Sequence, residues 1–207
     1  MRIARLIYPI NVLGRGSRIG LWLAGCPHHC EGCSNPELWA PESAEDISTE
    51  AILAAIEGIF HSNDVQGITI TGGEPFWQAT ELSVLIKRLK ALTGDILVYS
   101  GYTLAELIEM RNADVDSVLS AIAVLIDGRY IQERNSMLPL RGSDNQVIHI
   151  LDTDYERLYR EYLSSLPERS QVQNFLSLGS VISVGIHKPS FNDDFDRLMR
   201  KNGLGER

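Results

Sequence analysis

The spacing of apolar residues switches repeatedly along the chain between the two-residue period of strands and the three-to-four-residue period of helices. Strands are predicted at the short apolar runs, which are Arg18–Leu23, Gly67–Thr71, Ile96–Tyr99, Ala121–Ile126 and Gln146–Leu151. The run that starts at Ala121 is almost continuously apolar, which is typical of a parallel strand buried on both faces.

Helices are predicted between these strands. The first follows Ser48, a favourable N-cap, and has an apolar stripe formed by Ile52, Leu53, Ile56, Ile59 and Phe60. The second is expected to stop at Gly94 and has a stripe formed by Leu82, Leu85, Ile86, Leu89 and Leu92. Two further helices are predicted from capping pairs, namely Thr103 with Glu106 and Thr153 with Glu156.

The C-terminal part of the chain predicts a hairpin and a last helix. Val172–Leu178 and Val181–Ile186 flank Gly179-Ser180, as the two strands of a hairpin flank its turn. The last helix is expected to begin near Ser190, with its apolar residues at Phe191, Phe195, Leu198 and Met199.

Alternating strands and helices predict an α/β fold with a mostly parallel sheet and right-handed crossover connections. The loops that follow parallel strands meet at the carboxyl edge of such a sheet, where binding sites are built. At 207 residues the chain is long enough to bury a substantial core, and we expect one domain over residues 1–207.

Composition excludes two classes of partner. The formal net charge of −8 argues against non-specific binding to nucleic acid, which requires a basic surface. No apolar run reaches membrane-spanning length, and the N-terminus does not resemble a signal or transit peptide. We therefore expect a cytoplasmic protein without a membrane partner.

All three cysteines lie in one loop, Cys26-Pro27-His28-His29-Cys30-Glu31-Gly32-Cys33. Iron–sulfur clusters are normally held by four thiolates, so three thiolates would leave one iron open for chemistry. A zinc ion held by these thiols and His28 or His29 is the alternative, although zinc ligands usually come as two separated pairs. The odd number of cysteines disfavours a disulfide framework.

A second motif, Gly72-Gly73-Glu74-Pro75, follows the predicted strand Gly67–Thr71. Paired glycines permit positive φ angles and let the backbone approach a ligand closely. Glu74 offers an acceptor for an ammonium group, and Pro75 favours an extended conformation at Glu74. An ordinary glycine turn with a solvated glutamate is the alternative, and the cysteine loop upstream argues against it.

Together the two motifs resemble the radical S-adenosylmethionine (SAM) superfamily. The flanking sequence resembles the branch of this superfamily that activates anaerobic ribonucleotide reductases. The similar segments span nearly the whole chain and are Gly14–Arg18, Leu21–Trp39, Tyr99–Tyr102, Leu125–Tyr130, Leu140–Gln146 and Val184–Lys188. Gly32 fits this branch, whereas Ser34 stands where related activases usually have an aromatic residue.

The resemblance implies an enzyme with a partial, open (β/α) barrel and two cofactors. Its metal ligands would be Cys26, Cys30 and Cys33, holding a 4Fe-4S cluster whose open iron is chelated by SAM. Its SAM contacts would be Gly72, Gly73, Glu74, Ser100, Asp127 and Arg129, with Glu74 near the methionyl ammonium.

Some of these residues have alternative roles. Ser100 is alternatively a turn residue, and Asp127 and Arg129 alternatively form a structural salt bridge. Cofactor binding or partner docking is left open for Arg141, Ser143, Asn145 and Gln146, and His28 and His29 are interpreted as loop residues.

The implied reaction is radical generation on a protein partner. One electron from a flavodoxin-like or ferredoxin-like donor would cleave SAM to methionine and a 5′-deoxyadenosyl radical. That radical would take hydrogen from a backbone glycine of an anaerobic ribonucleotide reductase. Four arginines near the cysteine loop in sequence are either a donor-docking face or a solvated basic face: Arg2, Arg5, Arg15 and Arg18.

Two other functions remain open from the sequence. One is a radical SAM enzyme that acts on a small molecule or a peptide. The other is a zinc-binding interaction module without catalysis, which leaves the Gly72-Gly73-Glu74 motif unexplained. The three cysteines leave room for a single cluster, which disfavours activases that carry an additional cluster module.

Overall fold

The computed structural model describes residues 1–177 and 180–201 of the chain. Its strands are β1 (Ile3–Ile10), β2 (Arg18–Leu23), β3 (Gly67–Gly72), β4 (Ile96–Tyr99), β5 (Val124–Asp127), β6 (Val147–Ile150), β7 (Val172–Ser177) and β8 (Ser180–Gly185). Its α-helices are α1 (Thr49–Ser62), α2 (Ala79–Leu89), α3 (Leu104–Glu109), α4 (Ala113–Ala121), α5 (Glu156–Ser165) and α6 (Phe191–Lys201). None of the helices in the described part is both long and apolar enough to span a membrane.

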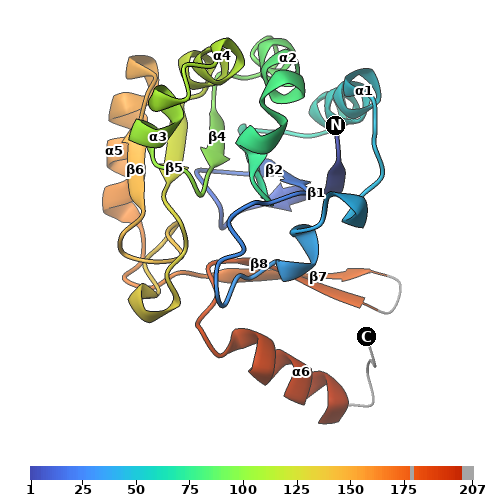
Figure 1. The fold of residues 1–207 in the computed structure, drawn as a ribbon, viewed down its shortest axis with the longest axis vertical. Coiled ribbons are helices and arrows are strands. Elements are labelled where there is room, and N and C mark those ends of the chain that lie inside the picture. Colours follow the sequence, from blue (N-terminus) through green and yellow to red (C-terminus); the bar gives the residue numbers. More distant parts are fainter. Residues whose placement is uncertain (178–179, 202–207) are drawn as a thin grey trace.

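Strands β1 to β6 form one sheet in sequence order, and β2, β3, β4 and β5 are parallel (Figure 1). The edge strands β1 and β6 run antiparallel to their neighbours. They do not pair with each other, so the sheet stays open. The predicted α/β class and mostly parallel sheet are confirmed, and the carboxyl ends of the parallel strands share one edge.

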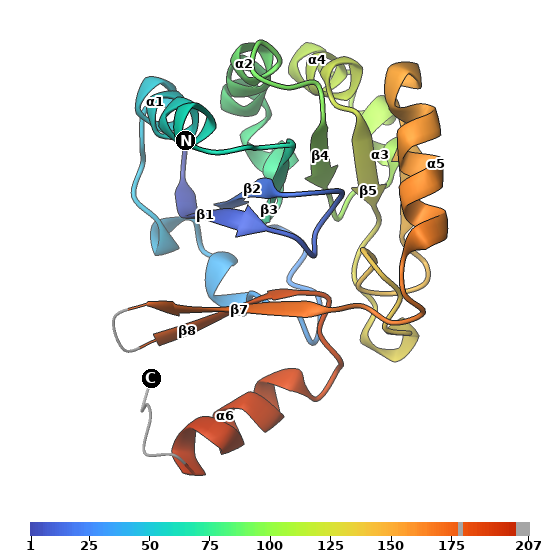
Figure 2. The ribbon, with the colours of Figure 1, turned by 180° about the vertical axis from the view of Figure 1, so that it is seen from behind.

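Alternate residues of the central strands face two different cores. Ile96 and Val98 of β4 pack in the core that includes α1, α2 and α4. Leu97, between them, packs instead with Tyr159 of α5. Period-two alternation therefore places α1, α2 and α4 on one face of the sheet and α5 on the other. The hairpin of β7 and β8 lies apart from the main sheet, with α6 beyond it (Figure 2).

Most predicted strands are present, with one error and one omission. β2 and β4 have the predicted bounds, but the predicted strand from Ala121 starts too early, because Ala121 ends α4 and β5 begins at Val124. A buried helix end followed by a buried strand gives one continuous apolar run, so periodicity does not separate them. β1 has no predicted counterpart. It is an edge strand containing Pro9, a residue that weakens strand signals.

The strand predicted at Gln146–Leu151 is present as β6, but it is antiparallel to β5. A parallel strand requires a crossover connection, usually a helix. No α-helix separates β5 from β6 in the described chain, and their connection contains only a 3-10 turn at Gln132–Arg134.

Two of the predicted N-caps, Ser48 and Thr103, are present at the start of their helices. Ser48 Oγ accepts a hydrogen bond from Ala51 N at 3.2 Å, and α3 begins with the predicted Thr103–Glu106 capping box. The predicted end of the second helix at Gly94 is wrong, because α2 ends at Leu89. Leu92 still packs against the core after the helix ends, so its apolar spacing continues through a turn.

The predicted cap at Thr153 is also wrong. Asp152 is the capping residue, and its carboxylate accepts a hydrogen bond from Asp154 N at 3.0 Å. The cap starts a 3-10 turn over Thr153–Tyr155, and α5 begins only at Glu156.

The predicted C-terminal hairpin and last helix are present. β7 and β8 pair antiparallel, and α6 begins at Phe191, next to the predicted start. Leu178 and Gly179, at the predicted turn, lie outside the described residues.

Candidate functional site

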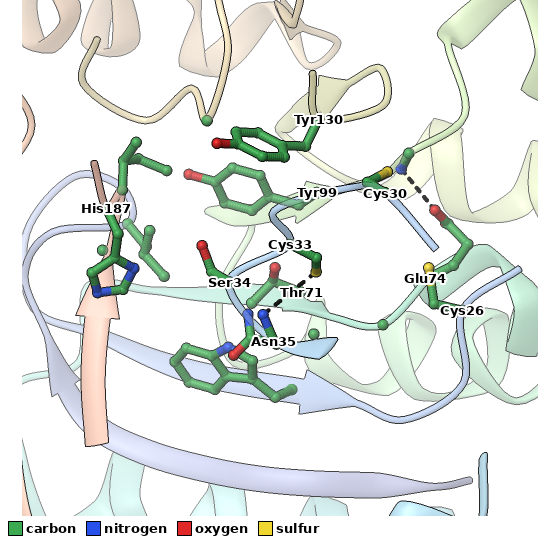
Figure 3. Close-up of a pocket in the computed structure, with 18 of the residues that line it drawn as sticks. Cys26, Cys30, Cys33, Ser34, Asn35, Thr71, Glu74, Tyr99, Tyr130 and His187 are labelled. Atoms are coloured by element: carbon green, nitrogen blue, oxygen red, sulfur yellow. Dashed lines mark hydrogen bonds between the residues drawn. The ribbon is translucent and has the colours of Figure 1, made fainter. Parts of the chain in front are cut away.

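Four loops that follow parallel strands line one pocket at the carboxyl edge of the sheet (Figure 3). The loop after β2 contributes the three cysteines, and the turn after β3 contributes Gly72, Gly73 and Glu74. The loops after β4 and β5 add Ser100, Gly101, Gly128 and Tyr130. Residues 182–187, from β8 and the chain after it, complete the wall. The expectation that the candidate segments converge on one edge is therefore correct.

The cysteine loop is tied down by backbone hydrogen bonds. Gly25 N donates to Leu38 O at 2.8 Å, Cys26 N donates to Trp39 O at 3.0 Å, and Cys33 N donates to Cys30 O at 3.2 Å. The cysteines are partly buried free thiols that face the pocket (Figure 3). Among the described residues, no three His, Cys, Asp or Glu side chains converge closely enough to hold a metal ion.

Burial raises the pKa of all three thiols above the usual value for cysteine. At Cys26 the backbone amides of His28 and His29 act in the opposite direction, but burial dominates its pKa. Metal ligands of this type bind as thiolates. Loading of a metal group here must therefore release protons, and loading should be easier as the pH rises.

The Gly72–Glu74 turn lies against the start of the cysteine loop. Gly72 has a φ angle of +110°, and a Cβ atom on Gly73 would lie 2.2 Å from Gly25 O. Two backbone hydrogen bonds continue the strand pairing, from Gly73 N to Leu23 O at 2.7 Å and from Glu74 N to Gly25 O at 2.8 Å. The glycines are thus required for close contact between two loops, in addition to any contact with a ligand.

Glu74 is fully buried, and its carboxylate joins the loops of three strands. Oε1 accepts from Ser100 Oγ at 3.0 Å and from Phe76 N at 3.0 Å. Oε2 accepts from Gly101 N at 2.7 Å and lies 3.2 Å from His28 Nε2. A carboxylate has about four acceptor positions, so these contacts occupy all of them. Glu74 is extended and is followed by Pro75, as predicted.

The other predicted cofactor contacts divide into two groups. Ser100 lines the pocket, but its hydroxyl already donates to Glu74 and accepts from Tyr102 N at 3.0 Å. Asp127 and Arg129 are not part of the pocket wall, although Gly128 between them is. The Asp127 carboxylate accepts from Leu104 N at the start of α3, and Arg129 lies 3.8 Å from Glu106 on the surface.

The polar cluster between Arg141 and Gln146 is engaged mainly with its own surroundings. Gln146 Nε2 donates to Gly128 O at 2.7 Å, and Ser143 Oγ accepts from Ile131 N at 3.1 Å. These bonds brace the loop that follows β5. Gln146 also lines the pocket, whereas Ser143 is fully buried and is not part of the pocket wall.

Two of the four arginines considered as a donor-docking or solvated basic face, Arg15 and Arg18, lie away from the cysteine loop, whereas Arg5 lines the pocket and pairs with Glu37. Arg18 is fully buried at the amino end of β2 and donates to Asp95 Oδ1 at 2.9 Å. Arg15 approaches the same Asp95 carboxylate at 3.4 Å. Both therefore belong to a buried ion-pair network at the end of the sheet opposite the cysteine loop. The sequence separation from the loop is short, but the length of β2 lies between them.

Two pocket residues outside the predicted set are Tyr99 and His187. The Tyr99 hydroxyl and His187 Nδ1 are buried and have no hydrogen-bond partner in the described structure. Figure 3 shows His187 at the end of the pocket opposite Cys26 and Cys30. Tyr99 was detectable as the last residue of a strand that precedes a predicted site residue. His187 comes from far along the chain, and only its place in the similar segment Val184–Lys188 could have connected it to the site.

A family model described as a 4Fe-4S single cluster domain matches residues 12–149. The chain is 38% identical over 151 residues to the anaerobic ribonucleoside-triphosphate reductase-activating protein of Vibrio cholerae, covering 69% of this chain and 94% of that protein. It is 35% identical over 152 residues to the protein of that name from Escherichia coli K12, covering 70% and 96%. The protein of that name from Enterobacteria phage T4 is 32% identical over 145 residues, covering 68% and 88%.

Proposed function

Because the chain belongs to the family of anaerobic ribonucleoside-triphosphate reductase-activating proteins, we propose that it activates a reductase of that kind by radical chemistry. The observation that carries the proposal is the placement of all three thiols on the same pocket as the Gly72–Glu74 turn. An iron–sulfur cluster agrees with the family model that matches residues 12–149.

Cys26, Cys30 and Cys33 are the proposed ligands of a 4Fe-4S cluster with one open iron. Zinc needs four donors around one point, with His28 or His29 as the fourth. His28 faces Glu74, and His29 stacks on Trp39 with ring centroids 4.9 Å apart. Each thiolate of a cluster ligates a different iron, so three thiols spread along a pocket wall suit a cluster.

SAM is the proposed second cofactor, and the same pocket offers polar atoms for it. The proposed ammonium site is formed by Gly72, Gly73 and Glu74, with Ser100 beside it. Asp127 and Arg129 lie outside the pocket wall, and they would affect SAM binding by positioning the loop that contains Gly128. The unpartnered Tyr99 hydroxyl supports the view that this pocket receives a polar ligand, since buried polar groups normally have partners.

The finer fold assignment belongs to the same proposal. The open sheet with four parallel strands would be the partial (β/α) barrel of the radical SAM type, forming a single domain. Support comes from the loops, because each of the four parallel strands is followed by a segment that lines the pocket.

When bound, the cluster and SAM would supply the radical chemistry needed to remove a hydrogen atom from a glycine of the reductase. The residues of this chain hold and orient the cofactors. The cysteine loop presents three thiolates to one side of the pocket. Trp22 and Tyr99 line the pocket and help to keep water away from a reactive intermediate.

Two partners follow from the proposed reaction. The reductase is the protein substrate, which the names of the relatives support. A flavodoxin-like or ferredoxin-like protein would deliver the electron, and the cytoplasm is the proposed compartment. Arg18 has no part in donor docking, because it is fully buried and paired with Asp95 at the other end of the sheet.

The test is low-temperature EPR of the anaerobically reconstituted, dithionite-reduced protein, with and without SAM. We expect a reduced 4Fe-4S signal whose shape changes when SAM is added, followed by a glycyl-radical doublet when the reductase is supplied. A cluster signal that is indifferent to SAM would contradict the cofactor assignment. Stoichiometric zinc without any cluster signal would contradict the enzyme assignment as a whole.

A further inference from the structure

His28 and His29 are neighbours in the cysteine loop with opposite environments. The His28 side chain is only 5% exposed, and its ring packs edge-on against Tyr102 with centroids 4.4 Å apart. His29 is exposed and stacks on Trp39. Only His28 is directed into the protein, so of the two histidines only His28 can position other residues of the site.

The inward face of His28 fits closely against the loop that follows β4. A Cβ atom on Gly101 would lie 2.3 Å from His28 Cδ2, so only glycine leaves room for the ring. His28 Nε2 lies 3.2 Å from Glu74 Oε2, and a carboxylate oxygen can only accept, so Nε2 is the donor. His28 is thereby the one side chain of the cysteine loop that hydrogen-bonds to Glu74 among the described residues.

Glu74 in turn connects the loops of three neighbouring strands. Its remaining donors come from its own turn and from the loop after β4, namely Phe76 N, Ser100 Oγ and Gly101 N. A change at His28 would leave these three bonds in place and would release only the side-chain connection to the cysteine loop. His28 therefore supplies the side-chain contact that, beside the backbone bond from Glu74 N to Gly25 O, sets how the cysteine loop sits relative to the Gly72–Glu74 turn.

We propose that His28 is a positioning residue which, through Glu74, fixes the spacing between the three thiols and the SAM-binding turn. The inference rests on the proposed function. SAM that chelates the open iron and also contacts the turn must fit both at once, so a shift between the two loops weakens its binding. Outer contacts of metal ligands typically change metal affinity or activity by about tenfold or more when they are removed, and we expect an effect of similar size on SAM binding.

The test compares three variants of the full-length protein with the parent protein. His28→Leu removes the donor, His28→Gln keeps an N–H group that reaches Glu74, and His29→Leu is the matched control in the same loop. Iron and sulfide content is measured first, and the SAM dissociation constant is then obtained from the SAM-dependent change in the EPR signal. Thermal unfolding of the cluster-free proteins checks the fold.

We expect His28→Leu to load as much iron as the parent protein and to bind SAM about tenfold more weakly. His28→Gln should recover most of the affinity, and His29→Leu should match the parent protein. If His28→Leu does not fold, His28→Gln and His28→Asn carry the comparison, because the shorter amide does not reach Glu74 and only the Asn variant should bind weakly.

Three results overturn the inference. Unchanged SAM affinity in His28→Leu would show that the contact positions nothing. Tighter SAM binding would show that His28 competes with the ammonium group for Glu74. Loss of iron would place His28 with the cluster ligands. A parent protein whose cluster does not respond to SAM would instead remove the proposed function, and this inference with it.

Discussion

At the scale of single residues, Glu74 has more functions than the sequence motif suggests. It is fully buried, and four donors from three loops converge on its carboxylate. Because all acceptor positions are in use, an incoming ammonium group must share or replace one of these contacts. Glu74 therefore contributes to the stability of the site as well as to its proposed chemistry.

Glu74→Ala is expected to lower both SAM affinity and protein stability. It leaves the buried Ser100 hydroxyl and Gly101 amide without an acceptor, at roughly 1–3 kcal/mol for each unpaired group. Urea unfolding of the cluster-free protein measures the loss of stability, and the EPR titration measures the loss of SAM affinity. An unfolding free energy equal to that of the parent protein would contradict the role of Glu74 in joining the loops.

Cys30→Ala is expected to abolish the cluster signal and all SAM cleavage, because two thiolates remain for a site that requires three. Iron and sulfide analysis with EPR measures the loss. Ser34→Ala is the control, since Ser34 lines the same pocket without a proposed ligand role. Retention of a SAM-responsive cluster in Cys30→Ala would refute the ligand assignment.

At the scale of elements, the hairpin of β7 and β8 is a wall of the site rather than an appendage. Val184 of β8 is buried in a core shared with Trp22 of β2. Gln173 Nε2 donates to Pro9 O at 2.9 Å, which attaches β7 to β1, and Asn135 Nδ2 donates to His187 O at 2.9 Å. The hairpin is therefore anchored at several points to the domain that carries the thiols.

The His187 side chain makes this attachment sensitive to acid. Burial lowers the pKa of His187 from 6.5 to about 4. The unfolded chain therefore binds a proton near pH 6.5 that the folded protein accepts only near pH 4, so stability should fall as the pH decreases across this window.

Substitution of His187 by Phe should remove part of that pH dependence. The measurement is urea unfolding of the cluster-free protein at several pH values between 7.5 and 4. His61→Gln, at an exposed position in α1, is the control and should keep the slope of the parent protein. An identical slope in His187→Phe would show that His187 does not couple folding to pH.

At the scale of the whole molecule, the two ends of the parallel strands have different tasks. The carboxyl end carries the thiols and the pocket. The amino end carries a buried network in which Arg18 bonds Asp95 and Thr69, and Tyr159 of α5 donates to the same Asp95. This network joins β2, β3 and α5.

Arg18→Met should destabilise the fold by about 3–5 kcal/mol, because it leaves the Asp95 carboxylate buried without its main partner. Arg15→Met is the control. Arg15 is 28% exposed and lies farther from Asp95, at 3.4 Å, so its loss should have a much smaller effect. Urea titration measures the free energy of unfolding of each variant. An unfolding free energy of Arg18→Met equal to that of the parent protein would show that the network does not stabilise the fold.

The sequence by itself determined the family and most of the elements. The thiol spacing and the Gly72-Gly73-Glu74 motif are local patterns, and the caps at Ser48 and Thr103 are satisfied within one turn of chain. Local hydrogen bonds and side-chain periodicity act over a few residues, so they are visible without a fold. The parallel sheet follows from the same periodicity, since alternating elements leave few other topologies.

Only the tertiary structure decided which side chains meet. In the folded protein His28 hydrogen-bonds to Glu74, and Arg18 is buried in an ion pair with Asp95. His187 lines the same pocket as the cysteines, although it lies far from them in sequence. The tertiary structure also shows that β6 runs antiparallel to β5 and that α4 ends before β5 begins. These outcomes depend on burial and on contacts between segments distant in the chain, where the free energy of packing overrides any local pattern.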